Sequence, residues 1–439
     1  MTAASAVAIV IAGLLIAPAP VTAAATQGPP CPAPGPPAPV TKHVTATSRP
    51  VVLVHGWTGQ PLDSTATKLS AKLGSAITTF TFNYSKWASD WASDAHIAAC
   101  LADYVNLIST AYRHVGGDGK VILVAHSMGG LAIRYASSPT LAAVPITSDE
   151  VPVVISLDTP YLGSSWAGAP PMLKELWQTA VGNSAPNPFG TDAAECLAAH
   201  DNGQPLPSQC KGLPPWLPKG TTLYEIGGDI KVSRTLLGVH LYDVDLKDDG
   251  VVDTRSSLGY GTSGPTGKAT AVTAHKSTLS CTVDSGTIGA SVASKFGAVL
   301  SSLGLPAEAI GDAAVYLDLR DGKATKATMV YTAAALATAE CSHIHIPTDA
   351  DAIDLVAKDI KTYLAAHPSA PRCLSTAAGK PLLAKLVASE GLDVADVQWI
   401  KCDGDWATTE FDVVEPDMPD DPNDDVAAFH FVNGSWRAV

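Results

Sequence analysis

Short apolar runs alternate with longer amphipathic segments between residues 49 and 226. The runs rich in β-branched residues are Val51–Val54, Ile77–Phe82, Val121–Val124, Val153–Leu157 and Thr222–Ile226. Nearly continuous apolarity over so few residues is typical of parallel strands covered on both faces. Between the second and third runs, apolar residues recur at helical spacing: Ile97, Leu101, Tyr104, Val105, Ile108 and Tyr112. Strands that alternate with helices predict an α/β fold, with a mostly parallel sheet and helices on both faces.

A helical pattern over residues 348–366 marks the end of this domain. Asp349 or Asp351 stands near its start, and His367-Pro368 follows its last turn. Because proline cannot continue a helix, we expect the helix to end there. The α/β domain is therefore predicted to span residues 49–367. Residues 368–439 are predicted to form a small accessory module.

Two long insertions interrupt the predicted domain, at residues 161–220 and 259–340. The first contains large apolar side chains: Met172, Leu173, Leu176, Trp177, Trp216 and Leu217. An apolar insertion of this kind suits a lid or a wall over a binding site, and a rigid cap over the core is the competing interpretation. The second insertion contains an amphipathic pattern of small residues over Ser285–Leu305. It predicts a helix that closes the same site or only pads it.

The N-terminal segment has the features of a secretory signal peptide. Residues 6–17 are an apolar run too short to span a bilayer, and Ala23-Ala24-Ala25 fits a cleavage site for small residues. We therefore predict a signal peptide at residues 1–25, a Pro-rich linker at 26–48 and a secreted, extracellular protein with no transmembrane span after cleavage.

The cysteine content agrees with export. The chain has 8 cysteines at wide spacing and no Cys-x-x-Cys pair, which favours disulfides over a zinc or redox site. Proximity along the chain suggests the pairs Cys196–Cys210, Cys281–Cys341 and Cys373–Cys402, which leaves Cys31 with Cys100. Other connectivities stay open, because a sequence does not fix how cysteines pair.

The charge balance excludes one class of partner. The formal net charge is −14, from 28 basic and 42 acidic residues, so the protein repels the phosphate backbone of nucleic acids. The negative charge is concentrated near the C-terminus. Residues 403–425 hold 10 acidic and no basic residues, and such a block predicts a solvated loop.

The strongest chemical motif is Val121–Gly130, VILVAHSMGG. An apolar strand leads directly into Ala-His-Ser-Met-Gly-Gly, and a helical pattern follows. A nucleophilic serine needs this strand–turn–helix context, because the tight turn lifts its side chain above the sheet and tolerates only small neighbours. Ala125 and Gly129 are those neighbours. The pattern predicts Ser127 as a nucleophile, against the alternative of an ordinary serine at a helix N-terminus.

A second motif, Val51–Gly59 (VVLVHGWTG), places His-Gly at the end of the first strand. A loop at this place can donate a backbone N–H to a developing oxyanion, and the residue after the nucleophile donates the other. The predicted donors are the amides of Trp57 and Met128. We expect His55 to fix the loop and His126 to support the site from behind.

Together, HGWTG and AHSMGG resemble bacterial secreted lipases and esterases of the α/β-hydrolase superfamily. Val153–Ser165 (VVISLDTPYLGSS) resembles the strand and turn that follow in those enzymes, with Asp158 at the position of their usual glycine. The resemblance covers residues 49–367 and implies the α/β-hydrolase fold and a Ser-Asp-His triad. The C-terminal segment, with Cys402–Trp406 and Phe431–Trp436, resembles small Cys-Trp modules at the ends of secreted bacterial proteins, which implies a role in stability or attachment.

The resemblance also supplies the candidate for the acid of the triad. Lipases of this type carry Asn-Asp-Gly-Leu-Val at the acid position, and residues 248–252, DDGVV, match it. The second aspartate of this run is Asp249, whose role would be to orient a histidine. Asp253 and Asp248 are the alternatives. A calcium-binding or purely structural turn also fits this cluster, which includes Asp243 and Asp245.

The histidine is chosen from three candidates. His343, in Cys341–Pro347 (CSHIHIP), has the offset that family members use before their last helix. His275 lies closer to Asp249 along the chain, and His345 is two residues beyond His343. We prefer His343 because the closing helix follows directly.

These residues predict a secreted serine hydrolase that cleaves carboxylic esters, such as the acylglycerols, through an acyl-enzyme. No cofactor and no metal are expected to take part, and the expected partners are a lipid or other ester and, transiently, a lipid interface. An acyltransferase, a polyester or amide hydrolase, or a catalytically silent binding protein are the alternatives. The sequence does not decide among them, because one fold carries all these activities.

Overall fold

The structure is a computed structural model of the whole chain. It describes residues 31, 44, 45, 47–115, 117–164, 190–201, 205–236, 239–262, 272–284, 334–367, 376–403, 406–415, 418–432 and 435–438. Several predictions fall outside these residues: the signal peptide, most of the linker, the Met172–Trp177 part of the first insertion, the Ser285–Leu305 helix and the Cys373–Cys402 pair.

A seven-stranded sheet forms the centre of the larger domain, in the order β2-β1-β3-β4-β5-β6, with β7 also paired to β5. Its strands are β1 (Arg49–Val54), β2 (Ile77–Phe82), β3 (Ile122–His126), β4 (Val153–Leu157), β5 (Thr222–Leu236), β6 (Val239–Asp245) and β7 (Thr273–Asp284). All neighbours pair in parallel except β5 and β6. The mostly parallel sheet is thus confirmed, and all five predicted strands are present.

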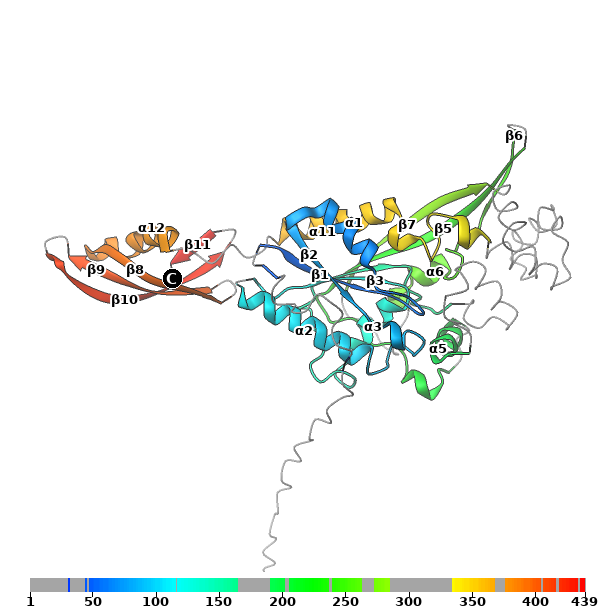
Figure 1. Ribbon diagram of the computed structural model, residues 1–439, viewed down its shortest axis with the longest axis horizontal. Helices are drawn as coiled ribbons and strands as arrows, with labels where there is room; N and C mark the ends of the chain where they lie inside the picture. The colour runs from blue at the N-terminus through cyan, green and yellow to red at the C-terminus, as the bar shows by residue number, and fades with distance from the viewer. Residues whose placement is uncertain are drawn as a thin grey trace, which may run out of the picture.

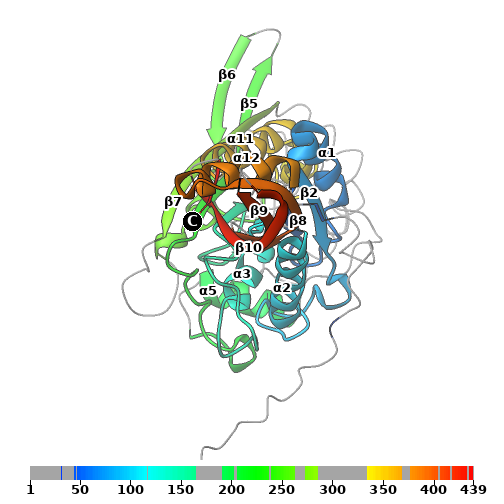
Figure 2. The ribbon, with the colours of Figure 1, turned by 90° about the vertical axis from the view of Figure 1, so that its left-hand side faces the viewer.

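Strand β5 extends well beyond the predicted strand at residues 222–226. Its second half pairs with β6 and β7. In Figure 2, β5 and β6 project from the body of the domain as a hairpin. Strands β6 and β7 were not predicted, because polar residues interrupt their apolar residues and no apolar run forms.

Helices cover both faces of the sheet, as predicted (Figure 1). The helices of this domain are α1 (Asp63–Leu73), α2 (Ala98–His114), α3 (Met128–Ala136), α5 (Asp192–Asp201), α6 (Thr254–Ser257) and α11 (Ala350–Ala366). Short 3-10 turns lie at Gly74–Ala76, Ser85–Trp87, Ser208–Cys210, Tyr260–Thr262 and Ile346–Thr348. Helices α1 and α11 pack on one face of the sheet, whereas α2, α3 and α5 pack on the other.

The closing helix begins where its sequence predicts. Asp349 is the N-cap of α11, and its side chain accepts a hydrogen bond from the amide of Ala352. This contact satisfies one of the amides that a helix start leaves free. The helix ends at Ala366, directly before His367 and the expected proline stop. Its buried residues join the core under β1, β3 and β4, which places the loop before it at the edge of the sheet.

Three predicted disulfides are present: Cys31–Cys100, Cys196–Cys210 and Cys281–Cys341. The third joins β7 to the loop that leads into α11. Among the described residues, no helix has both the length and the apolar character that crossing a bilayer requires.

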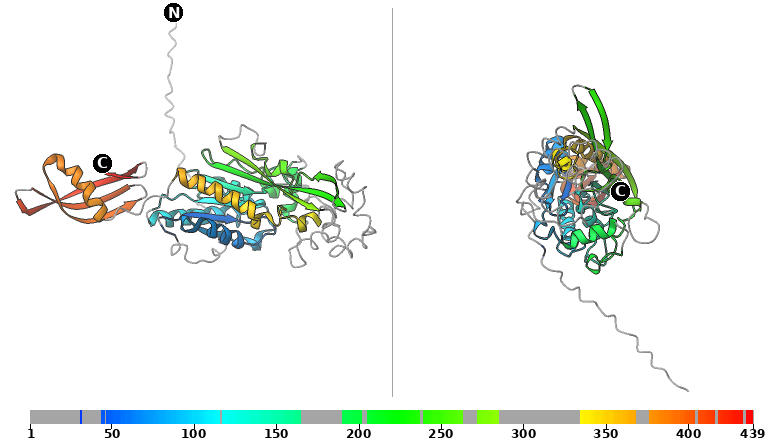
Figure 3. Two further views of the ribbon diagram at one scale, coloured as in Figure 1. Left: turned by 90° about the horizontal axis from the view of Figure 1, so that it is seen from above. Right: turned by 90° about the vertical axis from the view of Figure 1, so that its right-hand side faces the viewer.

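The C-terminal residues form a separate small domain at one end of the molecule (Figures 1 and 3). Helix α12 (Thr376–Val387) and a short turn at Ala388–Glu390 lead into a four-stranded antiparallel sheet in the order β11-β10-β9-β8. The strands are β8 (Asp393–Asp403), β9 (Trp406–Glu415), β10 (Met418–Val432) and β11 (Ser435–Ala438). Side chains of α12 and of the sheet form a core of their own.

The acidic segment at residues 403–425 is not a loop, so this prediction was wrong. It contains β9 and part of β10. Along β9, buried Ala407, Thr409, Phe411 and Val413 alternate with more exposed residues. An antiparallel sheet can leave one face in water, so acidic residues on that face are compatible with a strand. A count of charges over the whole segment does not show that buried and exposed residues alternate along β9.

Candidate active site

Ser127 lies on a sharp turn between β3 and α3. Its backbone has φ 55° and ψ −134°, a positive φ that non-glycine residues rarely adopt and that the surroundings must hold in place. One such restraint is the hydrogen bond that the Ser127 amide donates to the carbonyl of Leu157, at 2.9 Å. The turn sets the serine at the carboxyl edge of the parallel strands, where ligands bind in open α/β sheets.

Glycines let neighbouring segments approach this turn closely. A Cβ on Gly129 would lie 2.5 Å from the carbonyl oxygens of both Val54 and His55. A Cβ on Gly130 would overlap the Thr159 side chain, and one on Gly56 would overlap Ser127 itself. The loop after β1 therefore packs directly against the serine, as an oxyanion loop must.

Three predicted site residues meet through two hydrogen bonds. The Nε2 atom of His343 lies 2.8 Å from Ser127 Oγ, and its Nδ1 atom lies 2.6 Å from Asp249 Oδ2. Asp249 is 0% and His343 only 5% exposed. Because an ionised carboxylate only accepts hydrogen bonds, Nδ1 carries the proton and Nε2 accepts from the serine hydroxyl.

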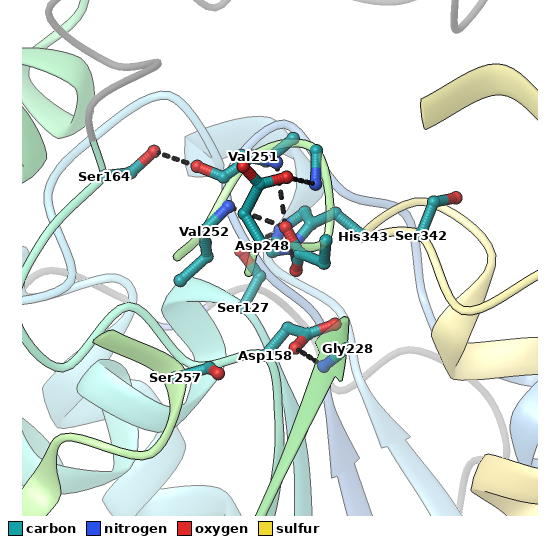
Figure 4. A network of polar contacts seen from close by, with 12 residues as sticks. Ser127, Asp158, Ser164, Gly228, Asp248, Val251, Val252, Ser257, Ser342 and His343 are labelled. Carbon is teal, nitrogen blue, oxygen red and sulfur yellow. Dashed lines mark hydrogen bonds and ion pairs between the residues drawn. The ribbon is translucent and has the colours of Figure 1, made fainter. Parts of the chain in front are cut away.

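The backbone around Asp249 holds its carboxylate in place. Its Oδ1 atom accepts hydrogen bonds from the amides of Val251, at 2.8 Å, and Val252, at 2.6 Å. Its carbonyl accepts from the amide of His343, at 2.9 Å. Figure 4 shows this turn above Ser127, with Ser164 donating to the Val251 carbonyl from the side. Acid and base are thus tied together by backbone as well as by side chains.

A cavity of about 280 Å³ opens beside Ser127. Its walls are His55, Trp57, Thr58, Gly59, Gln60, Pro61, Leu62, Ser64, Thr65, His126, Ser127, Val251, His343, Ile344, Pro347 and Thr348. Trp57, the predicted oxyanion donor, lies in this wall. Met128 is the first residue of α3, a place where a backbone amide has no acceptor within its own helix.

Residues 51–254 match the model of the Alpha/beta hydrolase family. The strand order, the serine turn and the helices on both faces are those of this fold. This part of the chain has the α/β-hydrolase fold.

No curated protein sequence matches the chain. Among solved structures, the chain resembles a Bacillus licheniformis lipase in its mature form, with 21% identity, 56% of this chain and 89% of that chain covered, and a TM-score of 0.30. It also resembles an esterase of Rhodococcus sp., with 16% identity, 54% and 85% covered, and a TM-score of 0.30. A third similar structure is lipase B of Aspergillus fumigatus, with 18% identity and a TM-score of 0.27. The match covers 42% of this chain and 39% of that chain.

The alternative histidines lie away from Ser127. His275 is an exposed residue of β7 that stacks on Tyr224, with ring centres 4.9 Å apart. The Nδ1 atom of His345 lies near Ser342 Oγ and the carbonyl of Ala339. Neither contacts Ser127 in the described structure.

The alternative acids also have other partners. Asp248 Oδ1 accepts from the amide of Gly250, at 2.8 Å. Asp253 pairs with Asp248 as an isolated backbone bridge and precedes α6 as its N-cap residue. Of the three candidate aspartates, only Asp249 contacts His343 in the described structure.

Two further histidines brace the site. His55 stacks on Tyr84, and its Nε2 atom accepts from the Tyr84 amide. Burial lowers the pKa of His55 to about 4. His126 Nε2 lies 2.8 Å from the carbonyl of His343, and burial lowers its pKa well below the usual value. Both rings are therefore neutral, and His126 donates to the carbonyl of His343.

The described part of the first insertion is held against α3 and the core. The buried Arg134 of α3 donates hydrogen bonds to the carbonyls of Pro214 and Pro215. Its guanidinium lies 5.4 Å from the ring centre of Trp216. Leu217 is buried in the core. Trp216 and Leu217 were both expected in a lid or wall over the site. They pack on the core, and neither is among the residues that line the cavity.

One group of side chains is spaced as metal ligands would be. Within the described residues, Asp158, Asp249 and His343 place one ligand atom each within 4.8 Å of one another. His343 and Asp249 already hydrogen-bond to each other, so this spacing needs no metal ion to explain it. The sequence pattern did not predict Asp158 as a residue of the site. Asp158 was noted only because it stands at the position of the usual glycine in the family motif.

Proposed function

We propose that this protein is a serine hydrolase of carboxylic esters, with Ser127 as nucleophile, His343 as general base and Asp249 as the acid that orients it. The observation that carries the proposal is the continuous hydrogen-bonded chain from Ser127 through His343 to Asp249 beside an open cavity. A catalytic triad is recognised by the geometry and roles of its nucleophile, base and orienting acid, and not by their positions in the sequence.

In the first half of the reaction, His343 Nε2 takes the proton of the Ser127 hydroxyl while Oγ attacks the ester carbonyl. The amides of Trp57 and Met128 would then donate to the resulting oxyanion. When the tetrahedral intermediate collapses, the bond to the alkoxide breaks, and His343 returns the proton to this leaving group. Asp249 stabilises the histidine cation throughout.

In the second half, water attacks the acyl-enzyme and His343 takes its proton. Collapse of this intermediate releases the carboxylic acid and returns the proton to Ser127. Each step uses the same oxyanion donors. Losing one such donor costs about 10²–10³ in rate in related enzymes.

The walls of the cavity favour esters with apolar groups. Six of its lining residues are apolar: Trp57, Pro61, Leu62, Val251, Ile344 and Pro347. We therefore propose lipid esters such as acylglycerols as the substrate class, handled in transient contact with a lipid interface.

Secretion is part of the same proposal. The apolar run at residues 6–17 is followed by small residues suited to cleavage near Ala25. Three disulfides, Cys31–Cys100, Cys196–Cys210 and Cys281–Cys341, need an oxidising compartment to persist.

The test is hydrolysis of p-nitrophenyl esters with acyl chains of two to eighteen carbons, with Ser127→Ala alongside. Turnover should be lost in the variant by a factor on the order of 10⁶, and a fluorophosphonate probe should label the native protein but not the variant. The chain-length optimum separates a lipase from a short-chain esterase.

Two outcomes would contradict the proposal. Equal turnover in the native protein and Ser127→Ala would exclude Ser127 as the nucleophile. Probe labelling without hydrolysis of any ester would point to acyl transfer or to a polyester or amide substrate, and a folded protein with neither would be a silent binding protein.

A further inference from the structure

A second carboxyl group lies against the triad, and the mechanism above gives it no part. Asp158 follows β4 directly and is 0% exposed. Its Oδ1 atom accepts a hydrogen bond from the amide of Gly228 on β5, at 2.6 Å (Figure 4). Its Oδ2 atom is buried and has no hydrogen-bond donor among the described residues. A buried carboxylate oxygen without a donor is costly, so this atom needs an explanation.

The neighbour of this oxygen is the acid of the triad. One carboxylate oxygen of Asp158, one of Asp249 and one ring nitrogen of His343 all lie within 4.8 Å of one another. The packing leaves little space between them, because a Cβ on Gly228 would overlap Cys341 and lie 3.2 Å from Asp158 Oδ2. Two ionised carboxylates both only accept hydrogen bonds and repel each other, so such a contact is favourable only with a proton in it.

The other partners of Asp249 show which group carries that proton. An ionised carboxylate has about four acceptor sites. Three of those on Asp249 are occupied by the amides of Val251 and Val252 and by His343 Nδ1. Within the part of the chain that the structure describes, Asp158 in contrast accepts a hydrogen bond from one amide, that of Gly228. Asp249 is therefore the better stabilised anion, and Asp158 is the group that keeps the proton.

We propose that Asp158 is a positioning residue for the triad, held as the neutral carboxylic acid and donating its Oδ2 hydrogen to the carboxylate of Asp249. The proposal rests on the proposed ester hydrolysis. The donated hydrogen bond fills the fourth acceptor site of Asp249 and fixes the carboxylate toward His343. Among the described residues, the titratable groups that face Asp158 are Asp249 and His343, and β5 adds only the Gly228 amide.

The electrostatic surroundings agree with this geometry. Burial, and next the negative charge of Asp249, raise the pKa of Asp158 well above its usual value. Above that pKa the side chain ionises, and two adjacent carboxylates then repel each other. The hydrogen bond to Asp249 is therefore lost as the pH rises.

The first experiment compares Asp158→Asn with Asp158→Ala. Asparagine keeps an oxygen for the Gly228 amide and an N–H for Asp249, whereas alanine keeps neither. We expect kcat within about threefold of the native value for Asp158→Asn, and a loss of about 10- to 100-fold for Asp158→Ala with a smaller change in KM, as for a hydrogen bond to a charged group. Glu225→Gln is the control for loss of a buried carboxyl elsewhere, on β5. Like Asp158, Glu225 is buried and accepts a backbone amide, that of Tyr260, but its Oε2 atom lies 3.8 Å from Lys276 Nζ and it does not contact the triad in the described structure.

The second experiment reads the proton without turnover. A carboxyl whose pKa is raised on folding stabilises the protein at low pH, and this contribution is lost as the pH rises through the folded-state pKa. The Tm of the native protein minus that of Asp158→Asn should therefore fall as the pH rises above about 4, the ordinary pKa of an aspartate. Ionisation of Asp158 should also lower the kcat of the native protein at high pH. In Asp158→Asn, which has no proton to lose at this position, kcat should stay constant to higher pH.

The outcomes separate this proposal from the proposed function. A Tm difference that does not change with pH, or an Asp158→Asn variant as slow as Asp158→Ala, would overturn the protonated Asp158. If Asp158→Ala does not fold, the pH dependence in Asp158→Asn decides. An inactive native protein with the expected fall in Tm difference would support the carboxyl pair and reject the ester hydrolysis.

Discussion

The two halves of the candidate site are held by different forces. The nucleophile half, around Ser127, is fixed by close backbone packing that glycines allow. The acid–base half, around Asp249 and His343, is fixed by buried hydrogen bonds and by the Cys281–Cys341 disulfide next to the histidine. Packing tolerates no added volume, whereas a polar network tolerates no missing partner. The two halves should therefore fail in different ways.

The largest expected effect is on the acid–base half. In Asp249→Asn the amide can donate to His343 and favours the wrong tautomer, so kcat should fall by about 10⁴, with little change in Tm. Ester hydrolysis under saturating substrate measures it. A loss below tenfold would show that Asp249 is not the orienting acid.

A smaller effect is expected from the disulfide that supports the same half. Replacing Cys281 and Cys341 together by serine should cost about 2–4 kcal/mol of unfolding free energy. Urea unfolding of the oxidised proteins measures this cost. The double replacement of Cys196 and Cys210, in the cap, is the control: it should destabilise the protein while kcat per folded molecule is preserved. If both pairs changed kcat equally, the first bridge would have no special role at the histidine.

The nucleophile half should respond to added volume. In Gly130→Ala the new Cβ meets the Thr159 side chain, and overpacking of this kind costs about 1–3 kcal/mol. The double variant Gly130→Ala/Thr159→Gly removes the colliding atoms and should recover part of the loss. The third variant is Thr159→Gly alone. If the losses of unfolding free energy in the two single variants, measured by urea unfolding, add up to the loss in the double variant, the two positions are not coupled.

The smallest effect concerns pH and the loop after β1. The folded-state pKa of His55, about 4, lies below the ordinary value of 6.5, so the unfolded chain binds the proton first. The stability that this histidine contributes is present above the ordinary pKa and is lost as the pH falls toward 4. At pH 5.5 the loss should be about 1 kcal/mol. His55→Gln should remove that part of the pH dependence in urea unfolding, and an unchanged dependence would contradict it.

Five of the seven strands of the larger sheet were predictable, because buried parallel strands form short, nearly continuous apolar runs. The strands at Ile77–Phe82 and Val153–Leu157 begin and end as predicted. Strands β6 and β7 were missed, and β9 was mistaken for a loop. These three carry many polar residues and depend on pairing with a neighbour, which local composition does not record.

The choice among candidate residues shows the same limit. Asp248, Asp249 and Asp253 lie within six residues of one another, and only the fold of the turn decides which one faces His343. Of the two histidines in CSHIHIP, the fold likewise directs His343 toward Asp249 and Ser127, whereas His345 lies near the carbonyl of Ala339. Asp158 was noted for replacing a glycine, but its burial against Asp249 comes from β4, β5 and the loop after β6 together.

The sequence by itself determined the strand–turn–helix around Ser127, the buried parallel strands and the start of α11 at Asp349, because each depends on neighbours in the chain or on strong local preferences. Only the tertiary structure decided which acid and base meet Ser127, that Arg134 fixes the cap, and that Asp158 lies beside Asp249. These arrangements join segments as much as 216 residues apart. Their energies come from burial and from contacts across the sheet, which no local pattern encodes.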